Sequence, residues 1–254
     1  MSFFRDNLAP RLRLIRTAFT RRFIYQDLIS TVRDYGVEYR DVCADTGPLD
    51  LAQDLFGAQV DRPPDFATVI QPLATFTPPG APVIFNSEPS VARFLGQLVF
   101  HRRIQTVVEL GCFVGWTTAH LALGMQARSS SGRIFAVDYM QEYLDLMKSN
   151  LCRHALDGLV TPVRGMSLDP TVLAALPQKV DLIFLDTSHA YPDTLEEVLA
   201  YTPRLAPGGY LVMHDSVSIA GVRRSLAELP DRFRRHTFAT ERGNGVTVLQ
   251  HRSG

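Results

Sequence analysis

The segment 106–122, TVVELGCFVGWTTAHLA, constrains the fold of this chain more than any other part of the sequence. An apolar run leads into Glu109, two glycines follow at Gly111 and Gly115, and a helix-like apolar pattern comes next. This order predicts a strand, a tight turn and a helix N-terminus, which together bring backbone N–H groups close to a nucleotide-like ligand. We expect Gly111 to adopt a positive φ and Gly115 to let helix and strand pack closely. Plain α/β connections can carry the same glycines.

A second acidic residue follows at the end of the next expected strand. The run RIFAVDY (133–139) predicts a strand that ends at Asp138, roughly 20 residues past the glycine turn, where nucleotide-binding α/β folds hold a ribose. A carboxylate there accepts strong hydrogen bonds from two hydroxyls. The alternative is a solvated aspartate at a strand end.

Phe113 occupies the position that a dinucleotide-binding G-x-G-x-x-G turn gives to its second glycine. That glycine lets the backbone approach a pyrophosphate, so a bulky aromatic residue argues against NAD. It favours a cofactor without phosphates, such as S-adenosylmethionine.

The rest of the chain from residue 86 alternates between strand and helix patterns. Strands are expected near 105–110, 133–138, 160–164, 180–186 and 209–214, and helices at 89–102, 116–127, 140–154, 170–176, 192–203 and 221–229. Such alternation predicts a mainly parallel sheet with helices on both faces. HTFATE and GVTVLQ, separated by a glycine-rich turn at 242–245, predict a closing antiparallel hairpin.

The first 85 residues have a different character. Apolar residues recur at helical spacing near the start of the chain, at Leu8, Leu12, Ile15, Phe19 and Phe23. Six arginines lie between and beside them, at Arg5, Arg11, Arg13, Arg16, Arg21 and Arg22. Such a helix could lie on an anionic membrane, but we expect it to cover its own domain or a dimer partner. Residues 34–82 are rich in Pro, Gly and Asp, which indicates helices and loops over the site. We therefore expect residues 1–85 to form a helical cap or lid that contributes to self-association.

Charge and cysteine content limit the classes of partner. The 26 basic and 26 acidic side chains cancel, so no overall charge favours nucleic acid. Three widely spaced cysteines indicate neither a disulfide frame nor a zinc site and suit a reducing compartment. No apolar run reaches the length of a membrane span, so we expect a cytoplasmic protein without a transmembrane segment.

Three blocks of sequence carry a family resemblance: ELGCFVGWTT, VDY, and VDLIFLDTSHAYPDTLEEVLAYTPRLAPGGYLVMHDS. Over roughly 87–250 the chain resembles class I S-adenosylmethionine-dependent methyltransferases. It is most similar to the catechol O-methyltransferase-like branch and to natural-product O-methyltransferases with an LDxxHxY segment. The resemblance implies a Rossmann-like methyltransferase domain over 86–254, with a mainly parallel seven-stranded sheet whose last strand is antiparallel.

Ligands of such sheets lie at the carboxyl ends of the strands. By this rule and the resemblance, Met166 packs on the purine and the Ser167 hydroxyl bonds its edge, although Met166 could equally be ordinary packing. The expected cofactor-binding residues are Glu109, Gly111, Cys112, Phe113, Gly115, Thr117, Asp138, Tyr139, Met166, Ser167 and Asp186.

Methyl transfer to an oxygen requires that the acceptor be oriented and lose its proton. His189 could remove the proton as a general base, with Asp186 and Asp215 orienting the site. Alternatively, Asp186 and Asp215 could hold a divalent metal such as Mg²⁺, as the catechol-type resemblance implies. That pattern has an Asp-Asn or Glu-Asp pair after the same strand, where this chain has His214-Asp215-Ser216. Ser216 offers only a neutral hydroxyl and His214 is a poor ligand for Mg²⁺, so we favour His189 as the base.

The sequence therefore predicts an O-methyltransferase that acts on a hydroxyl of a small molecule, such as a natural product or a sugar-like acceptor. Two alternatives stay open, a NAD-dependent oxidoreductase and a non-catalytic binding protein on the same fold. We expect a homo-oligomer formed through the N-terminal helix and no nucleic-acid partner.

Overall fold

The computed structural model describes residues 47–48, 86–128, 131–230, 233–240 and 242–251. The sequence predicts a cap, a lid and a self-association helix over residues 1–85. Apart from residues 47–48, this segment lies outside the described residues. Among the helices that are described, none is both long and apolar enough to cross a membrane.

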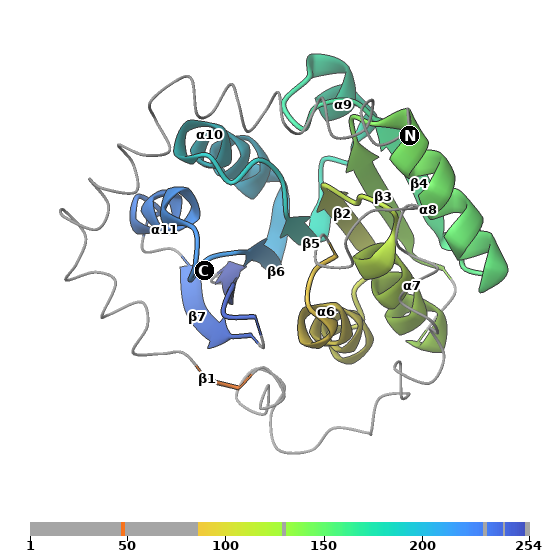
Figure 1. Ribbon diagram of the computed structural model, residues 1–254, viewed down its shortest axis with the longest axis horizontal. Helices are drawn as coiled ribbons and strands as arrows, with labels where there is room; N and C mark the ends of the chain where they lie inside the picture. Colours follow the sequence, from red (N-terminus) through yellow and green to blue (C-terminus); the bar gives the residue numbers. More distant parts are fainter. Residues whose placement is uncertain (1–46, 49–85, 129–130, 231–232, 241, 252–254) are drawn as a thin grey trace, which may run out of the picture.

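One mixed sheet forms the centre of the domain, with the strand order β1-β7-β8-β6-β5-β2-β3-β4 (Figure 1). Among the described strands, only the pairings of β8, with β6 and with β7, are antiparallel. Without the short β1, the strands counted from β2 follow the order 3-2-1-4-5-7-6 with an antiparallel last strand, which confirms the predicted fold class. The strands are β1 Gly47–Pro48, β2 Thr106–Leu110, β3 Arg133–Asp138, β4 Val160–Arg164, β5 Val180–Leu185, β6 Leu205–His214, β7 Phe233–Ala239 and β8 Val246–His251.

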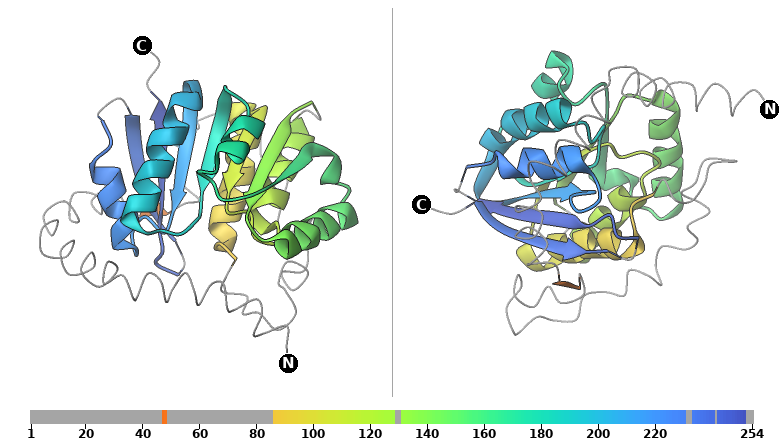
Figure 2. Two further views of the ribbon diagram at one scale, coloured as in Figure 1. Left: turned by 90° about the horizontal axis from the view of Figure 1, so that it is seen from above. Right: turned by 60° about the vertical axis from the view of Figure 1, so that its left-hand side comes forward.

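Helices cover both faces of this sheet (Figures 1 and 2). One face carries α6 Pro89–Arg102, α7 Trp116–Arg128 and α8 Gln141–Arg153, and the other carries α9 Pro170–Ala175, α10 Tyr191–Tyr201 and α11 Ala220–Ala227. Two short 3₁₀ helices, η4 Asp157–Leu159 and η5 Thr202–Arg204, precede β4 and β6. The three layers follow from the βαβ alternation, because each strand buries side chains toward both sides.

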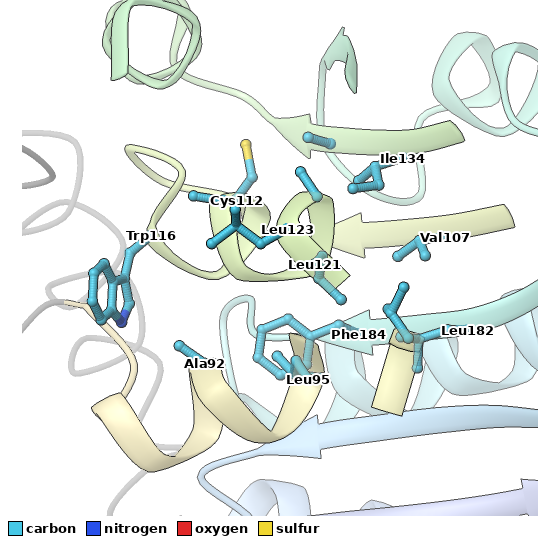
Figure 3. Close-up of a cluster of buried hydrophobic side chains, with 14 of the residues drawn as sticks. Ala92, Leu95, Val107, Cys112, Trp116, Leu121, Leu123, Ile134, Leu182 and Phe184 are labelled. Atoms are coloured by element: carbon cyan, nitrogen blue, oxygen red, sulfur yellow. The ribbon is translucent and has the colours of Figure 1, made fainter. Parts of the chain in front are cut away.

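Alternate residues of the strands point to opposite faces of the sheet and belong to two separate hydrophobic clusters. In β2, Val107 packs with α6, α7 and α8, whereas Val108 packs with the side chains of α9, α10 and α11. Figure 3 shows the first cluster, in which Leu95 of α6 and Leu121 of α7 meet Phe184 of β5. Each such buried side chain stabilises the fold by roughly 1.5–3 kcal/mol. Because each strand is packed on both faces, its position along the sheet is fixed, and so is the position of its carboxyl end.

The predicted elements match the observed ones closely, with one informative difference. The fifth core strand, β6, begins at Leu205 and not near residue 209. Leu205 already pairs with Val180, and the register shifts before Leu182 pairs with Tyr210. Thus the LAPGG segment, 205–209, adds an irregular extension to the strand, while Pro203 and Arg204 lie in η5.

Candidate active site

The glycine turn after β2 packs against the loop after β5. Gly111 has φ 85°, and its N–H donates to the Val137 carbonyl at 2.9 Å. A Cβ added at Gly111 would lie 2.0 Å from the Asp186 carbonyl oxygen, a distance that no side chain tolerates. The predicted positive φ is confirmed, and the missing side chain places the turn directly beside Asp186.

Gly115 serves a different contact from the one expected. Its φ is 88°, and an added Cβ would lie 2.6 Å from Cγ of Met147 on α8. The residue therefore allows the turn to approach α8, whereas we expected a close approach of helix and strand. Phe113 also has a positive φ, 49°, and its buried ring packs edge-on against Tyr143 of α8. These contacts hold the turn to the helix that follows β3.

Asp138 ties the glycine turn to the end of β3. Its Oδ2 accepts a hydrogen bond from the Phe113 N–H and its Oδ1 accepts one from the Met140 N–H, both at 3.0 Å. The side chain is 8% exposed, and a carboxylate has about four acceptor positions, so it can still accept hydroxyl hydrogen bonds. Tyr139 follows at the same strand end and is half-buried.

Glu109 is fully buried and joins β2 to the start of α7. Its carboxylate accepts hydrogen bonds from the Thr117 hydroxyl and, at 2.5 Å, from the Thr118 hydroxyl. Burial raises the pKa of Glu109 to about 8, and the charges of Asp186 and Asp138 act in the same direction. Glu109 and Thr117, both predicted to bind the cofactor, are therefore hydrogen-bonded to each other.

Cys112 is buried within the glycine turn, and burial raises the pKa of its thiol well above the ordinary value. A neutral, inaccessible thiol is a poor nucleophile. The backbone N–H of Cys112 donates to the Val137 carbonyl at 3.1 Å, so packing is what this residue can offer a ligand.

The loop after β4 contains both residues expected beside an adenine. Met166 is 47% exposed, and its N–H donates to Oδ2 of Asp169 at 2.8 Å. The Ser167 hydroxyl donates to Glu197 of α10, whose other carboxylate oxygen accepts from the Thr187 hydroxyl at 2.6 Å. Glu197 is buried and links the loops that follow β4 and β5, a role that its place within a regular helix pattern did not reveal.

Four side chains meet at the carboxyl ends of β5 and β6: Asp186 and His189 from the loop after β5, His214 at the end of β6, and Asp215 just after it. One donor atom from each lies within 4.8 Å of all the others. Nε2 of His189 lies 3.1 Å from Oδ1 of Asp186 and 3.2 Å from Oδ2 of Asp215. The structure thus brings together the three residues that the sequence predicted to be catalytic, and it adds His214.

Two members of this cluster have strained backbones. His189 has φ 60° and Asp215 has φ 57°, in the left-handed region that residues with a Cβ seldom adopt. Such conformations cost about 1–3 kcal/mol each and persist where the surrounding structure imposes them, most often at functional sites. The strain is consistent with side chains that are aimed at a common point.

Mutual charge controls the protonation of the cluster. Burial alone would raise the pKa of Asp186, but the charges and hydrogen bonds of His214 and His189 hold this pKa well below its ordinary value. Burial alone would lower the pKa of His189, but the hydrogen bond and charge of Asp186, and then the charge of Asp215, raise it. For Asp215, burial dominates and raises its pKa. Asp186 and the two histidines thus stabilise one another's charged forms, whereas the net effect on Asp215 favours its neutral form.

A second layer of contacts orients the cluster from the segment before α6. Glu88 is fully buried, and its Oε2 lies 2.6 Å from Nε2 of His214, while its Oε1 accepts from the Thr240 hydroxyl at 2.7 Å. The Ser87 hydroxyl donates to Oδ2 of Asp186 at 2.8 Å. Sequence reasoning missed Ser87, Glu88 and the inward orientation of His214. The only available indication was an acidic residue just before a helix whose apolar face must be buried.

Ser216 takes no part in the cluster. Its buried hydroxyl accepts a hydrogen bond from Thr247 of β8 at 2.9 Å, so it is engaged within the sheet. The His214 ring, and not the Ser216 hydroxyl, therefore belongs to the cluster with Asp186 and Asp215.

Comparisons with known proteins identify the domain and the fold. Residues 108–216 match the family described as a methyltransferase domain. The O-methyltransferase hkm8 of Aspergillus hancockii is 27% identical over 140 residues, which are 55% of this chain and 49% of that protein. The chain thus spans about half the length of this curated relative.

Solved structures share the fold at low identity. The O-methyltransferase of Bacillus cereus, in complex with SAH, has a TM-score of 0.62 and 19% identity, covering 83% of this chain and all of that one (100%). The O-methyltransferase TomG of Streptomyces achromogenes, in complex with SAM, has a TM-score of 0.59 and 19% identity, covering 80% of this chain and 96% of that one. At such identities the likeness shows the fold, and the chemistry must be argued from the site.

Proposed function

We propose that this chain is a class I, S-adenosylmethionine-dependent methyltransferase that transfers the methyl group to a hydroxyl of a small molecule. The observation that carries the proposal is the cluster of Asp186, His189, His214 and Asp215 beside the glycine turn. A cofactor on that turn would present its sulfonium near groups able to take a proton. The names of the similar proteins, all O-methyltransferases in the cases given above, support an oxygen acceptor.

The reaction needs little from the protein besides orientation and proton removal. The hydroxyl oxygen attacks the methyl carbon, the carbon–sulfur bond breaks with its electron pair on sulfur, and S-adenosylhomocysteine leaves. Asp138 would accept hydrogen bonds from the ribose, and Gly111 lets the turn lie against the Asp186 backbone, at the edge where the cofactor would bind. The acceptor must then lie above Asp186, at the end of β5.

His189 is the first candidate for the proton acceptor. Its Nε2 faces carboxylate oxygens of Asp186 and Asp215, which stabilise the imidazolium that proton transfer creates. An acceptor hydroxyl would have to replace one of these carboxylates next to Nε2. The raised pKa of His189 makes it a stronger base, although a smaller fraction is neutral at a given pH.

A bound Mg²⁺, which the catechol-type resemblance implies, does not fit the donors that are present. Two of the four converging groups are imidazoles, whereas Mg²⁺ prefers oxygen ligands and retains several waters. Ser216 supplies no further oxygen because its hydroxyl is engaged with Thr247. We therefore assign no step of the reaction to Mg²⁺.

Cofactor binding provides the direct test. Calorimetry should detect S-adenosylmethionine and S-adenosylhomocysteine, and Asp138→Ala should weaken both by roughly 1–3 kcal/mol through the loss of charge-assisted hydrogen bonds. Transfer of a labelled methyl group to simple phenols and catechols, followed by mass spectrometry, then tests the oxygen acceptor. Binding of NAD in place of S-adenosylmethionine would favour the oxidoreductase alternative and overturn the proposal. Cofactor binding without transfer to any hydroxylated compound would favour a binding protein.

A further inference from the structure

We propose that Gly221 and Tyr191 are positioning residues for methyl transfer, because together they hold the loop that carries His189 against helix α11. The inference deepens the proposed function and rests on it for the role of His189 as the base. The contacts that hold the loop come from α11 and from no bound ligand, so part of the test needs no methyl acceptor.

Helix α11 lies beside α10 on one face of the sheet (Figures 1 and 2). Its Val222 and Leu226 are buried in the hydrophobic cluster on that face and hold the helix to the sheet. Four other residues of the helix and its C-cap, at the i, i+3, i+4 and i+7 spacing of neighbours on one helix face, are Gly221, Arg224, Ser225 and Glu228. Each of these four lies against the segment 189–191. The helix thus connects the core of the sheet to the loop of the expected base.

Gly221 brings the backbone of α11 against the backbone of the loop. A Cβ added there would lie 2.4 Å from the His189 carbonyl oxygen and 2.7 Å from the Tyr191 nitrogen. Gly221 does not have a positive φ, so its own backbone conformation would accept a side chain, and the close contact is what excludes one. Ordinary van der Waals contacts begin at 3.4 Å, so a methyl group at this position would displace the loop by about 1 Å.

The side chain of Tyr191 is held by the following turns of α11. Cζ of Arg224 lies 3.7 Å from the centroid of the Tyr191 ring, and the Tyr191 hydroxyl donates to Oε1 of Glu228 at 2.6 Å. Nε of Arg224 lies 3.6 Å from the same carboxylate oxygen, so the ring, the cation and the carboxylate form one contact group. The Ser225 hydroxyl lies 3.4 Å from the Tyr191 carbonyl oxygen. Tyr191, two residues after His189, is therefore held at both its main chain and its side chain.

The start of α11 also contacts the second strained residue of the cluster. The Ile219 N–H donates to the Asp215 carbonyl at 3.0 Å, directly before the helix begins. The helix therefore lies against the backbones of both His189 and Asp215, whose side chains are 3.2 Å apart. A left-handed backbone at a residue with a Cβ persists where its neighbours impose it, and α11 is a neighbour of both. A shift of the loop against α11 would move Nε2 of His189 relative to the acceptor.

Kinetics separate positioning from general damage to the fold. Gly221→Ala should lower kcat by about 10–100-fold, with the phenol or catechol that the unaltered chain methylates, because a misplacement of about 1 Å can cost that much. The KM for S-adenosylmethionine should barely change. Gly124→Ala is the matched control, since its added Cβ would lie 2.1 Å from the Gly96 carbonyl oxygen, between α7 and α6. The control should lower stability and leave kcat of the folded protein unchanged.

Tyr191 provides a second variant, at a half-buried side chain. Tyr191→Ala removes the contacts with Arg224 and Glu228 and should lower kcat about tenfold. Tyr191→Phe keeps the ring beside Arg224 and loses only the bond to Glu228, so it should recover most of the activity.

Nuclear magnetic resonance of the imidazole nitrogens tests the loop without acceptor or cofactor. The His189 signals, identified by their loss in His189→Gln, should shift in Gly221→Ala and in Tyr191→Ala and stay in place in Gly124→Ala. Unchanged signals in folded Gly221→Ala, or in Tyr191→Ala if the first variant fails to fold, would overturn the proposal. An equal loss of kcat in Gly124→Ala, or a loss of activity that arises from a raised KM for S-adenosylmethionine, would overturn it too. Shifted signals in a chain that methylates no hydroxylated compound would refute the proposed function and leave the loop contact in place.

Discussion

At the scale of single residues, His189 and its neighbours concentrate the chemistry that the sequence predicts. Asp186, His189 and Asp215 were predicted from their positions after two strands, and the structure brings them within hydrogen-bonding distance. His214 and Glu88 were not predicted as partners, because their contact joins residues 126 positions apart in the chain. No local pattern reports such a pairing, whereas a strand-end position can be read directly from the sequence.

His189→Ala should lower turnover by about 10²–10⁴-fold while the affinity for S-adenosylmethionine barely changes, because the side chain acts on the acceptor. Steady-state kinetics and calorimetry measure the two effects separately, with His236→Gln, on β7 and outside the cluster, as the matched control. Adding a chelator to the unaltered enzyme tests the metal-dependent alternative. Full activity after metal removal supports His189 as the base, and activity lost to the chelator and restored by a divalent metal supports the alternative. A variant as active as the unaltered enzyme would contradict the role of His189.

Glu109 should make stability fall as the pH rises. Its pKa is 4.5 ordinarily and about 8 in the fold, so the folded chain holds a proton that the unfolded chain releases between these values. The stabilising contribution is complete below pH 4.5 and is lost as the pH approaches 8, by on the order of 1 kcal/mol per pH unit.

Glu109→Gln removes this proton linkage and keeps a side chain that can bond Thr117 and Thr118. Urea denaturation of both proteins between about pH 5 and pH 8 should therefore show a smaller fall in the free energy of unfolding for the variant. Parallel curves would show that Glu109 is already ionised in the folded chain.

At the scale of elements, the sequence predicts most of the fold because each strand and helix has its own periodic pattern. The glycine turn and Asp138 lie where expected, and β3 and β4 match their predicted bounds. The LAPGG extension of β6 could not be predicted, because pairing with β5 and not local preference makes it extended. The same holds for Gly115, whose tight contact depends on where α8 packs.

Helices α6 and α7 pack so closely at Gly124 that there is no room for a side chain at this position. A Cβ added at Gly124 of α7 would lie 2.1 Å from the carbonyl oxygen of Gly96 on α6. Gly124→Ala should therefore destabilise the protein by about 1–3 kcal/mol, despite the better helix propensity of alanine. Gly158→Ala is the matched control, since nothing lies within 4 Å of its added Cβ. Thermal unfolding compares the two, and equal melting temperatures would contradict the close helix contact.

At the scale of the whole molecule, the described residues from 86 onward supply the glycine turn, the cluster and every described strand of the sheet except β1. Residues 1–85 were predicted to cap the acceptor site and to promote self-association, and this prediction still lacks a structural test. Its physical basis is the apolar stripe from Leu8 to Phe23, which would otherwise leave a large apolar face in water.

Deleting residues 1–30 should reduce turnover of the acceptor more than binding of S-adenosylmethionine, and it should lower the oligomeric state. Sedimentation measures the assembly, and kinetics and calorimetry measure the two functions. A truncated chain that keeps its assembly and full activity would show that the segment is neither cap nor dimerisation element.

The bonds between residues 86–88 and the C-terminal hairpin have a consequence for synthesis. Glu88 accepts from Thr240, and Arg242 donates to the Asn86 carbonyl, across 152 and 156 positions of chain. A ribosome must therefore deliver nearly the whole domain before Glu88 is fully held, and contacts of such long range form late in folding. A nascent chain that has already formed the glycine turn would still lack its finished cluster, so it should emerge inactive until the last hairpin joins the sheet.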